Sequence, residues 1–525
     1  SCVSRPVRLR IHRKEALWIM RSQLVLIASV AVLAAGTATA DNWPSWRGPS
    51  RNSVSNETGL PVTWGAKCTV ASAPANQNGG QAGGRATGRG GGNRGGRGGT
   101  GGRGNNLVAQ GRGGRGGGQR GGGNFGGGLE GRPITPLGCA EFDEQNVAWK
   151  LPLPAYSGST PIVWGDMIFL NVATQSNSGT LELWAVDRKT QTVAWKRPLA
   201  NNNHMERKQN MSTPSPVTDG QHVWVMTGVG ALKAFDFAGK EIWARSIQDD
   251  YGPFGLNWGY ASSPLLQGNA LYLQVLHGMK TDDPSYLLKI DKMTGKTIWR
   301  VERHTNAIDE SPDSYTTPTW IEANGRAELI ITGGDVISGH SPDTGQEYWR
   351  ADVLNPTNDR SYRLIASPTA VGDLIIAPSR NNPLTAIRPG GRGDVARSHI
   401  VWQFAQGPDV PTPVSDGELL YIVRDNGVVF ALDVKTGKTV YGPQRLPSGT
   451  YSASPVLADG KIYVTTEDTG LTSVFRSGPR FELLSSNSLA DDCSPYCLST
   501  VAVSEGQLFL RTASYLWVVG ERKGK

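Results

Sequence analysis

The feature that most constrains the fold is a unit of roughly fifty residues that recurs from Asn146 to the end of the chain. Each unit opens on Ser/Thr-Pro, continues through a short apolar strand and ends in a segment like Ala-x-Asp-x-x-Thr-Gly-Lys-x-x-Trp. The openings are Ser159-Thr160-Pro161, Thr213-Pro214, Ser262-Ser263-Pro264, Thr316-Thr317-Pro318, Ala366-Ser367-Pro368, Thr412-Pro413, Ser454-Pro455 and a degenerate Ser499-Thr500-Val501. The closing aromatics are Trp149, Trp195, Trp243, Trp299, Trp349, Trp402 and Tyr441. This period is typical of a four-stranded propeller blade.

The chemistry of the unit fits such a blade. Asp-x-x-Thr-Gly is a hairpin turn, in which Asp starts a type I turn and Gly takes the left-handed position after it. Alternation such as Leu271-Tyr272-Leu273-Gln274-Val275 predicts a strand. We expect the seven closing aromatics to be structural docking residues, whose large rings pack between neighbouring blades.

The two ends of the repeat region predict how the ring closes. The segment from Asn146 to Leu153 resembles an outer strand with its Trp149 but with no strands before it. The segment from Ser499 to Val519 resembles inner strands with no outer strand after them. Seven complete units and one composite blade give an all-β, eight-bladed propeller of four-stranded antiparallel blades. An open solenoid or a seven-bladed ring are the alternatives.

The N-terminus predicts export. Residues 1–40 are expected to be upstream sequence followed by a signal peptide that starts at Met20: Arg21 is basic, Leu24 to Ala35 is apolar, and Ala38-Thr39-Ala40 is a cleavage site. The apolar run of about 12 residues is short for a membrane anchor, since the hydrocarbon core is ~30 Å thick. We therefore expect a periplasmic or extracellular protein, a monomer without a membrane span in the mature chain.

A low-complexity insert accounts for the basic charge. Residues 77–132 hold 28 of the 67 glycines. They also hold nine arginines and a single acid, Glu130, so the net charge of this segment, 9 − 1 = +8, equals the formal net charge of the whole chain. Such a segment buries little apolar surface and is expected to be disordered. It lies between an N-terminal segment (41–76) and the propeller (133–525). Gly/Arg-rich runs can bind polyanions, so polyanion binding is an alternative function to a plain surface loop.

Four cysteines follow the expected cleavage site. Cys68 and Cys139 bracket the insert, and a disulfide between them would close a loop of about 70 residues, worth roughly 4 kcal/mol. Cys493 and Cys497 share one tight turn, where a disulfide or free thiols are favoured over zinc because no His or second Cys pair lies nearby in the sequence. The connectivity stays open.

These residues resemble the pyrroloquinoline-quinone-like (PQQ-like) propeller repeat family, which includes quinoprotein alcohol dehydrogenases and the propeller lipoprotein of the outer-membrane assembly machinery. The resemblance covers residues 146–525. The stretch from Asn42 to Pro49 (Asn-Trp-Pro-Ser-Trp-Arg-Gly-Pro) is also similar to the N-terminus of an exported bacterial branch. The repeat motif is specific for the fold and weakly specific for function, because the Trp is expected in catalytic and non-catalytic members alike.

For quinone chemistry the resemblance implies a calcium ion, an Asp base and two adjacent cysteines over the cofactor. The chain has no Cys-Cys pair and no haem-attachment Cys-x-x-Cys-His. The acids on the candidate inner loops, which are Asp309, Glu310, Asp335, Asp409 and Asp425, match no ligand pattern of the family. The sequence thus predicts no metal site and leaves the catalytic residues unknown, and PQQ and calcium stay possible. Motifs of the common hydrolases and phosphate loops are also missing.

A ligand of a propeller is expected at the funnel where the inner strands begin. Candidate residues precede the Ser/Thr-Pro openings and are Asn257, Trp258, Tyr315, Arg363, Asp409 and Tyr451, although packing of loops and blades explains each equally well. The leading functional hypothesis is a non-enzymatic binding scaffold that presents loops to a protein or carbohydrate partner. A PQQ- and Ca²⁺-dependent oxidoreductase of alcohols or sugars is the alternative.

Overall fold

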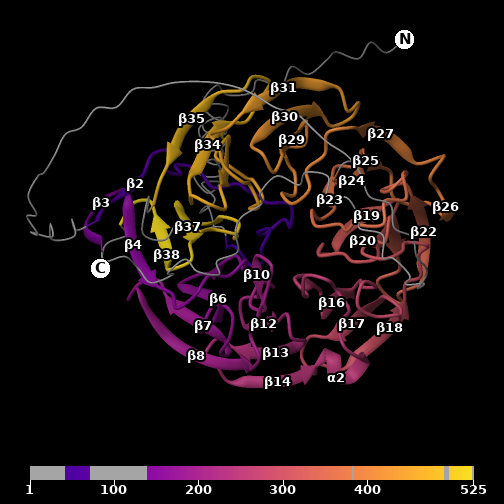
Figure 1. Cartoon of the computed structure of the whole chain (residues 1–525), viewed down its shortest axis with the longest axis horizontal. Coiled ribbons are helices and arrows are strands. Elements are labelled where there is room, and N and C mark those ends of the chain that lie inside the picture. Colours follow the sequence, from indigo (N-terminus) through magenta and orange to yellow (C-terminus); the bar gives the residue numbers. More distant parts are fainter. Residues whose placement is uncertain (1–41, 71–138, 381–382, 490–495, 523–525) are drawn as a thin grey trace, which may run out of the picture.

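The computed structural model describes residues 42–70, 139–380, 383–489 and 496–522. They form a ring of eight sheets around a central axis, which confirms the predicted all-β, eight-bladed propeller (Figure 1). Each blade has four antiparallel strands that follow one another from the centre of the ring outward, and two of the sheets gain a fifth, parallel strand. Among the described residues the one α-helix is short, α2 (Ile247–Tyr251), and no helix is long and apolar enough to cross a membrane.

From the inner to the outer strand, the first four blades are β5 (Ile162–Trp164), β6 (Met167–Ala173), β7 (Leu181–Asp187) and β8 (Thr192–Ala200); β11 (Val217–Thr218), β12 (His222–Met226), β13 (Ala231–Asp236) and β14 (Glu241–Ser246); β15 (Leu265–Gln267), β16 (Ala270–Val275), β17 (Tyr286–Asp291) and β18 (Thr297–Glu302); and β19 (Thr319–Ala323), β20 (Arg326–Gly333), β21 (Val336–His340) and β22 (Glu347–Asp352).

The remaining blades are β23 (Thr369–Val371), β24 (Leu374–Ala377), β25 (Leu384–Ile387) and β27 (Ile400–Phe404); β28 (Val414–Ser415), β29 (Leu419–Val423), β30 (Val428–Asp433) and β31 (Thr439–Arg445); β32 (Val456–Ala458), β33 (Lys461–Thr465), β34 (Thr472–Arg476) and β35 (Leu483–Asn487); and β36 (Ala502–Ser504), β37 (Gln507–Arg511), β38 (Tyr515–Val519) and β4 (Val147–Pro152). Strands outside these are β1 (Val54–Ser55), β2 (Gly65–Val70), β3 (Cys139–Gln145), β9 (Met205–Glu206), β10 (Gln209–Asn210) and β26 (Gly393–Asp394).

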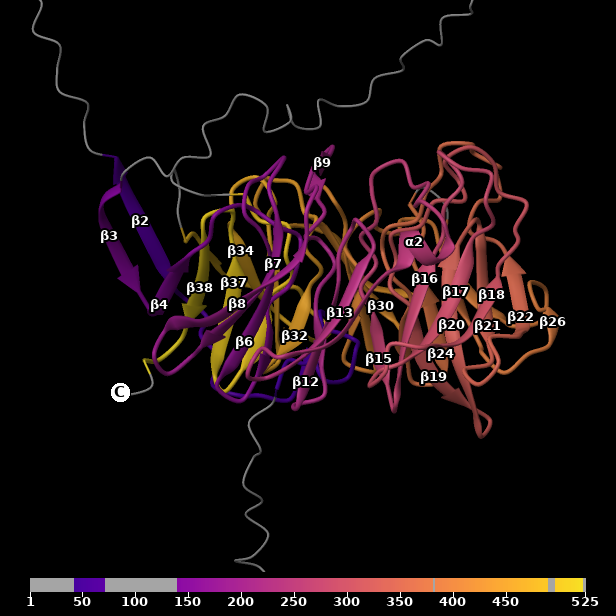
Figure 2. The ribbon, with the colours of Figure 1, turned by 90° about the horizontal axis from the view of Figure 1, so that it is seen from below.

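The composite eighth blade closes the ring as predicted. β4 from the N-terminal side pairs antiparallel with β38 from the C-terminal end, and the register places Trp149 opposite Val518. β3 and β2 form a separate antiparallel pair beside this blade at the rim of the ring (Figure 2). The backbone register of this strand pair places Val70 opposite Cys139. The side chains of Cys68 and Cys139, residue Cys493, the insert 77–132 and the expected signal peptide lie outside the described residues, so their predictions stay predictions.

The Ser/Thr residues at the blade openings form a closed circle of hydrogen bonds. In every blade the backbone N–H of this residue donates to the hydroxyl of its counterpart in the next blade, with N···O distances of 2.9 to 3.3 Å. The members in order are Thr160, Ser215, Ser263, Thr317, Ser367, Thr412, Ser454 and Thr500, and Thr500 donates back to Thr160. The second blade uses Ser215 before Pro216, two residues beyond the opening predicted at Thr213-Pro214.

Four of the closing tryptophans share one contact with the next blade. The indole N–H groups of Trp195, Trp243, Trp299 and Trp402 donate to backbone carbonyls of the following blade at 2.8 to 3.1 Å. Each ring lies against the glycine of the next hairpin turn, so that a Cβ at this glycine would meet the ring at 2.5 to 2.9 Å; the glycines are Gly239, Gly295, Gly345 and Gly437. These glycines also have positive φ, which explains why the turn requires glycine.

The other closing aromatics are placed differently. Trp149 lies in the core that the eighth and first blades share. Tyr441 packs against Phe481 of the seventh blade, with ring centroids 6.0 Å apart. Trp349 departs from the expected inter-blade contact: it is fully buried, and its indole donates to Glu328 of its own blade at 2.7 Å. The long loop of the next blade places β26 beside β22 there instead.

The ring has two distinct faces. The connections from each outer strand to the next inner strand lie on one face, which we call the loop face; β9 and α2 mark it at the top of Figure 2. The opposite turn face carries the tight turns and an N-terminal strap, residues 42–64. Trp43 pairs with Val163 of the first blade, and β1 pairs with β32 of the seventh blade. The strap therefore crosses the ring from the first to the seventh blade at the turn face.

Candidate functional site

All six funnel residues predicted from the sequence lie on connections of the loop face, and four of them meet. The connection before the third blade carries Asn257 and Trp258, the next one carries Tyr315, and the one after that carries Arg363. They gather around Glu310, which lies on the same connection as Tyr315.

Glu310 is the centre of this cluster. Its Oε1 accepts a hydrogen bond from the Trp258 indole at 2.6 Å and a longer one from the Asn257 amide at 3.4 Å. The Nε atom of Arg363 lies 3.6 Å from the same oxygen. The Tyr315 hydroxyl completes the link by accepting the Trp258 backbone N–H at 3.0 Å. One carboxylate therefore ties three consecutive connections together, which favours a rigid platform.

Asp313 supports the same loops from beneath. Its side chain is fully buried, and it accepts the backbone N–H of Asn257 at 2.6 Å and that of Met279 at 3.1 Å. Burial raises the pKa of Asp313 to about 6, and the neighbouring Glu310 charge adds to the rise. Both oxygens are thus occupied by amide donors from two connections.

A second acidic group joins Asp409, on the connection before the sixth blade, to Asp425, on the turn between β29 and β30 of that blade. Both oxygens of Asp425 accept backbone N–H groups, from Asp409 at 2.8 Å and from Val410 at 3.1 Å. Burial raises the pKa of Asp425 to about 6, with a further contribution from the Asp409 charge. Arg380 lies 3.5 Å from the Asp409 carboxylate. Asp409 therefore belongs to a separate ion-pair group and not to the Glu310 cluster.

The β9–β10 hairpin joins distant parts of the loop face, and sequence reasoning missed it. Lys208 at its tip donates to Ser452 and to Glu467 of the seventh blade, both at 2.8 Å. On the other side, Arg207 lies 5.0 Å from the centre of the Trp258 ring. The hairpin thus reaches from the third-blade connection to the seventh blade, toward the middle of the ring (Figure 1). No sequence motif predicts a contact between residues so far apart in the chain.

Tyr451 does not line the funnel. It is fully buried, its hydroxyl donates to the Pro447 carbonyl at 2.8 Å, and its ring lies against Gly427. Tyr451 is therefore a core residue of the sixth and seventh blades. Cys497 is also buried and carries a free thiol, whose pKa is raised by burial to about 11, so it is poorly suited to nucleophilic chemistry.

The loop-face acids do not fit a calcium site of the quinoprotein kind. Calcium requires several oxygens that converge on one point at 2.3–2.6 Å. The oxygens of Asp313 and Asp425 and the Oε1 of Glu310 already accept hydrogen bonds from N–H donors. In the described part of the chain, no three His, Cys, Asp or Glu side chains gather in a way that could hold a metal ion. We therefore derive no quinone chemistry from these residues.

The family described as outer membrane protein assembly factor BamB matches residues 137–253, 206–442 and 391–478. The chain belongs to this family. Within the BamB family, the chain is 28% identical over 140 residues to the outer membrane protein assembly factor BamB of Escherichia coli (strain K12) and to that of Shigella dysenteriae serotype 1 (strain Sd197). The matched segment spans 26% of this chain and 34% of each relative, about a third of their length.

Solved structures show the same fold at low sequence identity. BamB from Moraxella catarrhalis superposes with a TM-score of 0.50 at 15% identity, over 72% of this chain and 98% of that one. A europium-containing methanol dehydrogenase gives 0.53 at 12% identity, over 70% and 85%. The quinohemoprotein alcohol dehydrogenase from Comamonas testosteroni gives 0.52 at 11% identity, over 72% and 77%. BamB and two dehydrogenases share this ring, so the fold alone does not select a function.

Proposed function

We propose that this protein is a non-catalytic scaffold that binds a partner protein through the loop face over its third and fourth blades. The observation that carries the proposal is a pair of exposed apolar side chains on loops that the acidic cluster holds in place. Met279 is 45% exposed and Ile308 is 49% exposed. Exposed apolar anchors on rigid loops are a common basis of protein recognition, and methionine adapts well to a partner's surface.

Both anchors belong to the platform formed around Glu310 and Asp313. The backbone N–H of Met279 donates to Asp313, and the carbonyl of Ile308 accepts the backbone N–H of Ser311 at 3.1 Å. Fixed loops lose little conformational entropy when a partner binds, so the contact area converts more fully into affinity.

Charged groups surround these anchors. Asp309 and Arg360 form an ion pair beside Ile308, and Lys280 follows Met279 and lies 3.6 Å from Glu206. An apolar centre with a polar, charged rim is the usual anatomy of a protein interface. The arrangement fits a protein partner better than a carbohydrate.

The names of the relatives support a protein partner in an exported compartment. They are described as assembly factors for outer membrane proteins. A periplasmic place for this chain agrees with the signal peptide predicted at Met20. We propose the partner to be a component or client of outer-membrane protein assembly.

Site-specific photo-crosslinking in the native host tests this proposal. A photoreactive amino acid is placed at Met279, at Ile308 and, as a control, at Val440, which is 40% exposed on the outer strand β31. We expect one protein to be crosslinked from positions 279 and 308 and not from 440, and Ile308→Glu to abolish the product formed at 279. Equal products from all three positions, or none, would contradict the proposed site.

A reconstitution assay tests the enzymatic alternative directly. The purified protein is incubated with PQQ and Ca²⁺, and dye-linked oxidation of alcohols and sugars is followed. We expect no turnover. Stoichiometric PQQ uptake with turnover would replace the scaffold proposal by an oxidoreductase.

A further inference from the structure

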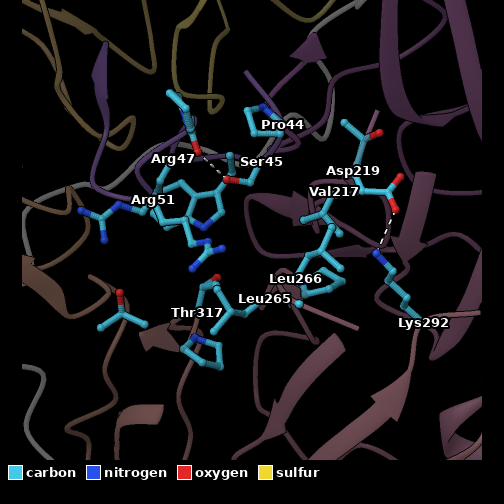
Figure 3. Close-up of a pocket in the computed structure, with 18 residues that line it drawn as sticks. Pro44, Ser45, Arg47, Arg51, Val217, Asp219, Leu265, Leu266, Lys292 and Thr317 are labelled. Carbon is cyan, nitrogen blue, oxygen red and sulfur yellow. Dashed lines mark hydrogen bonds and ion pairs between the residues drawn. The ribbon is translucent and has the colours of Figure 1, made fainter. Parts of the chain in front are cut away.

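The turn face contains a cavity that the N-terminal strap helps to enclose. Its volume is about 230 Å³, far more than the ~10–15 Å³ that a single water needs. It lies between the strap and the inner strands of the second, third and fourth blades (Figure 3). The lining side chains combine an apolar group, which includes Pro44, Trp46, Val217, Pro264, Leu265 and Leu266, with the charged residues Arg47, Arg51, Asp219 and Lys292.

The strap forms backbone hydrogen bonds with the inner strands of the first two blades. In the part of the chain that the structure describes, it forms none with the inner strand of the third blade. In the first blade, the N–H and C=O of Val163 pair with Trp43 at 2.9 and 2.8 Å. In the second blade, the N–H of Thr218 donates to Pro44 at 3.0 Å. Leu266 has the corresponding position in β15, because Leu265 pairs with Tyr272 as Ile162 pairs with Phe169. Its N–H and C=O therefore point away from β16, toward the centre of the ring, and within the described residues the strap makes no backbone bond to them.

The charges of the lining favour an anion. Lys292 is paired with Asp219 at 3.0 Å, and all three nitrogens of the Arg47 guanidinium already donate hydrogen bonds, to Ser53, Pro368 and Thr369. Arg51 has one bond, from Nη2 to Gln267, and no carboxylate partner in the described part of the chain. Its backbone φ is +57°, an uncommon value for a residue other than glycine. The strap thus holds a guanidinium with free donors at this cavity.

From these three observations, we infer that the cavity binds a small organic carboxylate that bears an apolar body. The carboxylate pairs with Arg51, which offers the geometry for two parallel N–H···O bonds. The apolar body covers Leu265, Val217 and Trp46, and an amide or carbonyl on the ligand pairs with the open edge at Leu266. This site is on the face opposite to Met279 and Ile308, so it does not depend on the proposed function.

Calorimetric titration with N-acetyl-leucine and with hexanoate tests the inference. N-acetyl-leucine carries the carboxylate, an apolar side chain and an amide, whereas N-acetyl-leucinamide has the same shape without the charge. We expect the acid to bind and the amide to bind at least about tenfold more weakly, because a charge-assisted pair is lost. If neither acid binds up to millimolar concentrations, or if the amide binds as well as the acid, the inference is overturned.

Variants of Arg51 locate the site. Arg51→Gln is expected to weaken binding of N-acetyl-leucine about tenfold or more, and Arg51→Lys to retain part of it, since the lysine keeps the charge but not the fork. Arg445→Gln, at an exposed arginine of β31, is the matched control and should bind as the parent does. Thermal unfolding of each variant shows that the strap and ring are intact. Unchanged binding by a folded Arg51→Gln protein would contradict the assignment.

Discussion

The backbone N–H of Thr500 donates to the hydroxyl of Thr160 at 3.2 Å, across 340 residues of sequence. This bond is the last of eight that link the blade openings in one direction around the ring. This circle of hydrogen bonds explains why the Ser/Thr-Pro motif recurs at the blade openings. The residue before each proline both donates and accepts in the circle, while proline has no N–H of its own to leave unpaired.

Thr160→Val should destabilise the fold, because it removes the acceptor of Thr500 and keeps the shape of the side chain. A buried N–H without a partner costs about 1–3 kcal/mol. We therefore expect urea unfolding to show a loss of that size. Thr439→Val, at an exposed threonine of β31, is the control. An equal effect of both changes would show that the circle does not stabilise the ring.

Gly437→Ala should destabilise the protein by more than the backbone strain at this position accounts for. Gly437 has a φ of +68°, and an added Cβ would meet the Trp402 ring at 2.5 Å. Gly417→Ala is a matched control: its φ is +96°, but the added Cβ would meet nothing within 4 Å. Both variants carry left-handed strain of about 1 kcal/mol. The difference between their unfolding free energies isolates the contact between the blades, and we expect it to be about 1–3 kcal/mol.

The fold could be predicted from the sequence because the motifs that define a blade are short and recur along the chain. The turn chemistry around residues such as Gly295 and the period of the closing tryptophans define a blade, and the two incomplete ends define the closure. The opening of the second blade was misplaced because Thr213-Pro214 and Ser215-Pro216 follow one another, and both satisfy the motif. Trp349 differs because its partner, Glu328, is buried in its own blade, a pairing that the shared spacing of the repeat does not reveal.

The candidate site was less predictable because its contacts are not local. Position before a Ser/Thr-Pro opening brought out Asn257, Trp258, Tyr315 and Arg363, which do meet. The same criterion also selected Tyr451, which is buried. Glu310 was visible only as one acid among several, and nothing in the sequence connects Lys208 with Glu467, which are 259 positions apart. Such pairs depend on how the ring brings loops of distant blades together.

Asp335→Asn should stabilise the protein near neutral pH and have little effect in acid. Burial raises the pKa of Asp335 from 3.8 to about 6, and the charges of Asp352 and Asp359 add to the rise. Between these values the native state binds more protons than the unfolded state, so stability falls as the pH rises from about 4 to about 6. Asparagine mimics the protonated acid and tolerates the φ of +69° at this position.

The measurement is the unfolding free energy of both proteins across this range of pH. We expect a gain on the order of 1–3 kcal/mol for Asp335→Asn at pH 7 that vanishes below pH 4. The control is Asp343→Asn, where the carboxylate is 93% exposed. If the gain is the same at every pH, the charge of Asp335 is not its source.

Arg47→Ala should detach the strap from the turn face before it destabilises the ring of blades. Arg47 is buried, and it donates to the Pro368 carbonyl at 3.0 Å and to the Thr369 hydroxyl at 2.8 Å, both at the opening of the fifth blade. Its loss leaves these acceptors unpaired and opens a void, which we expect to destabilise by about 2–4 kcal/mol. Because the circle of Ser/Thr residues does not include the strap, hydrogen exchange should accelerate at the Trp43 and Val163 amides and stay slow at Thr500. Arg445→Ala should change neither, and a uniform acceleration in Arg47→Ala would mean that strap and ring unfold as one unit.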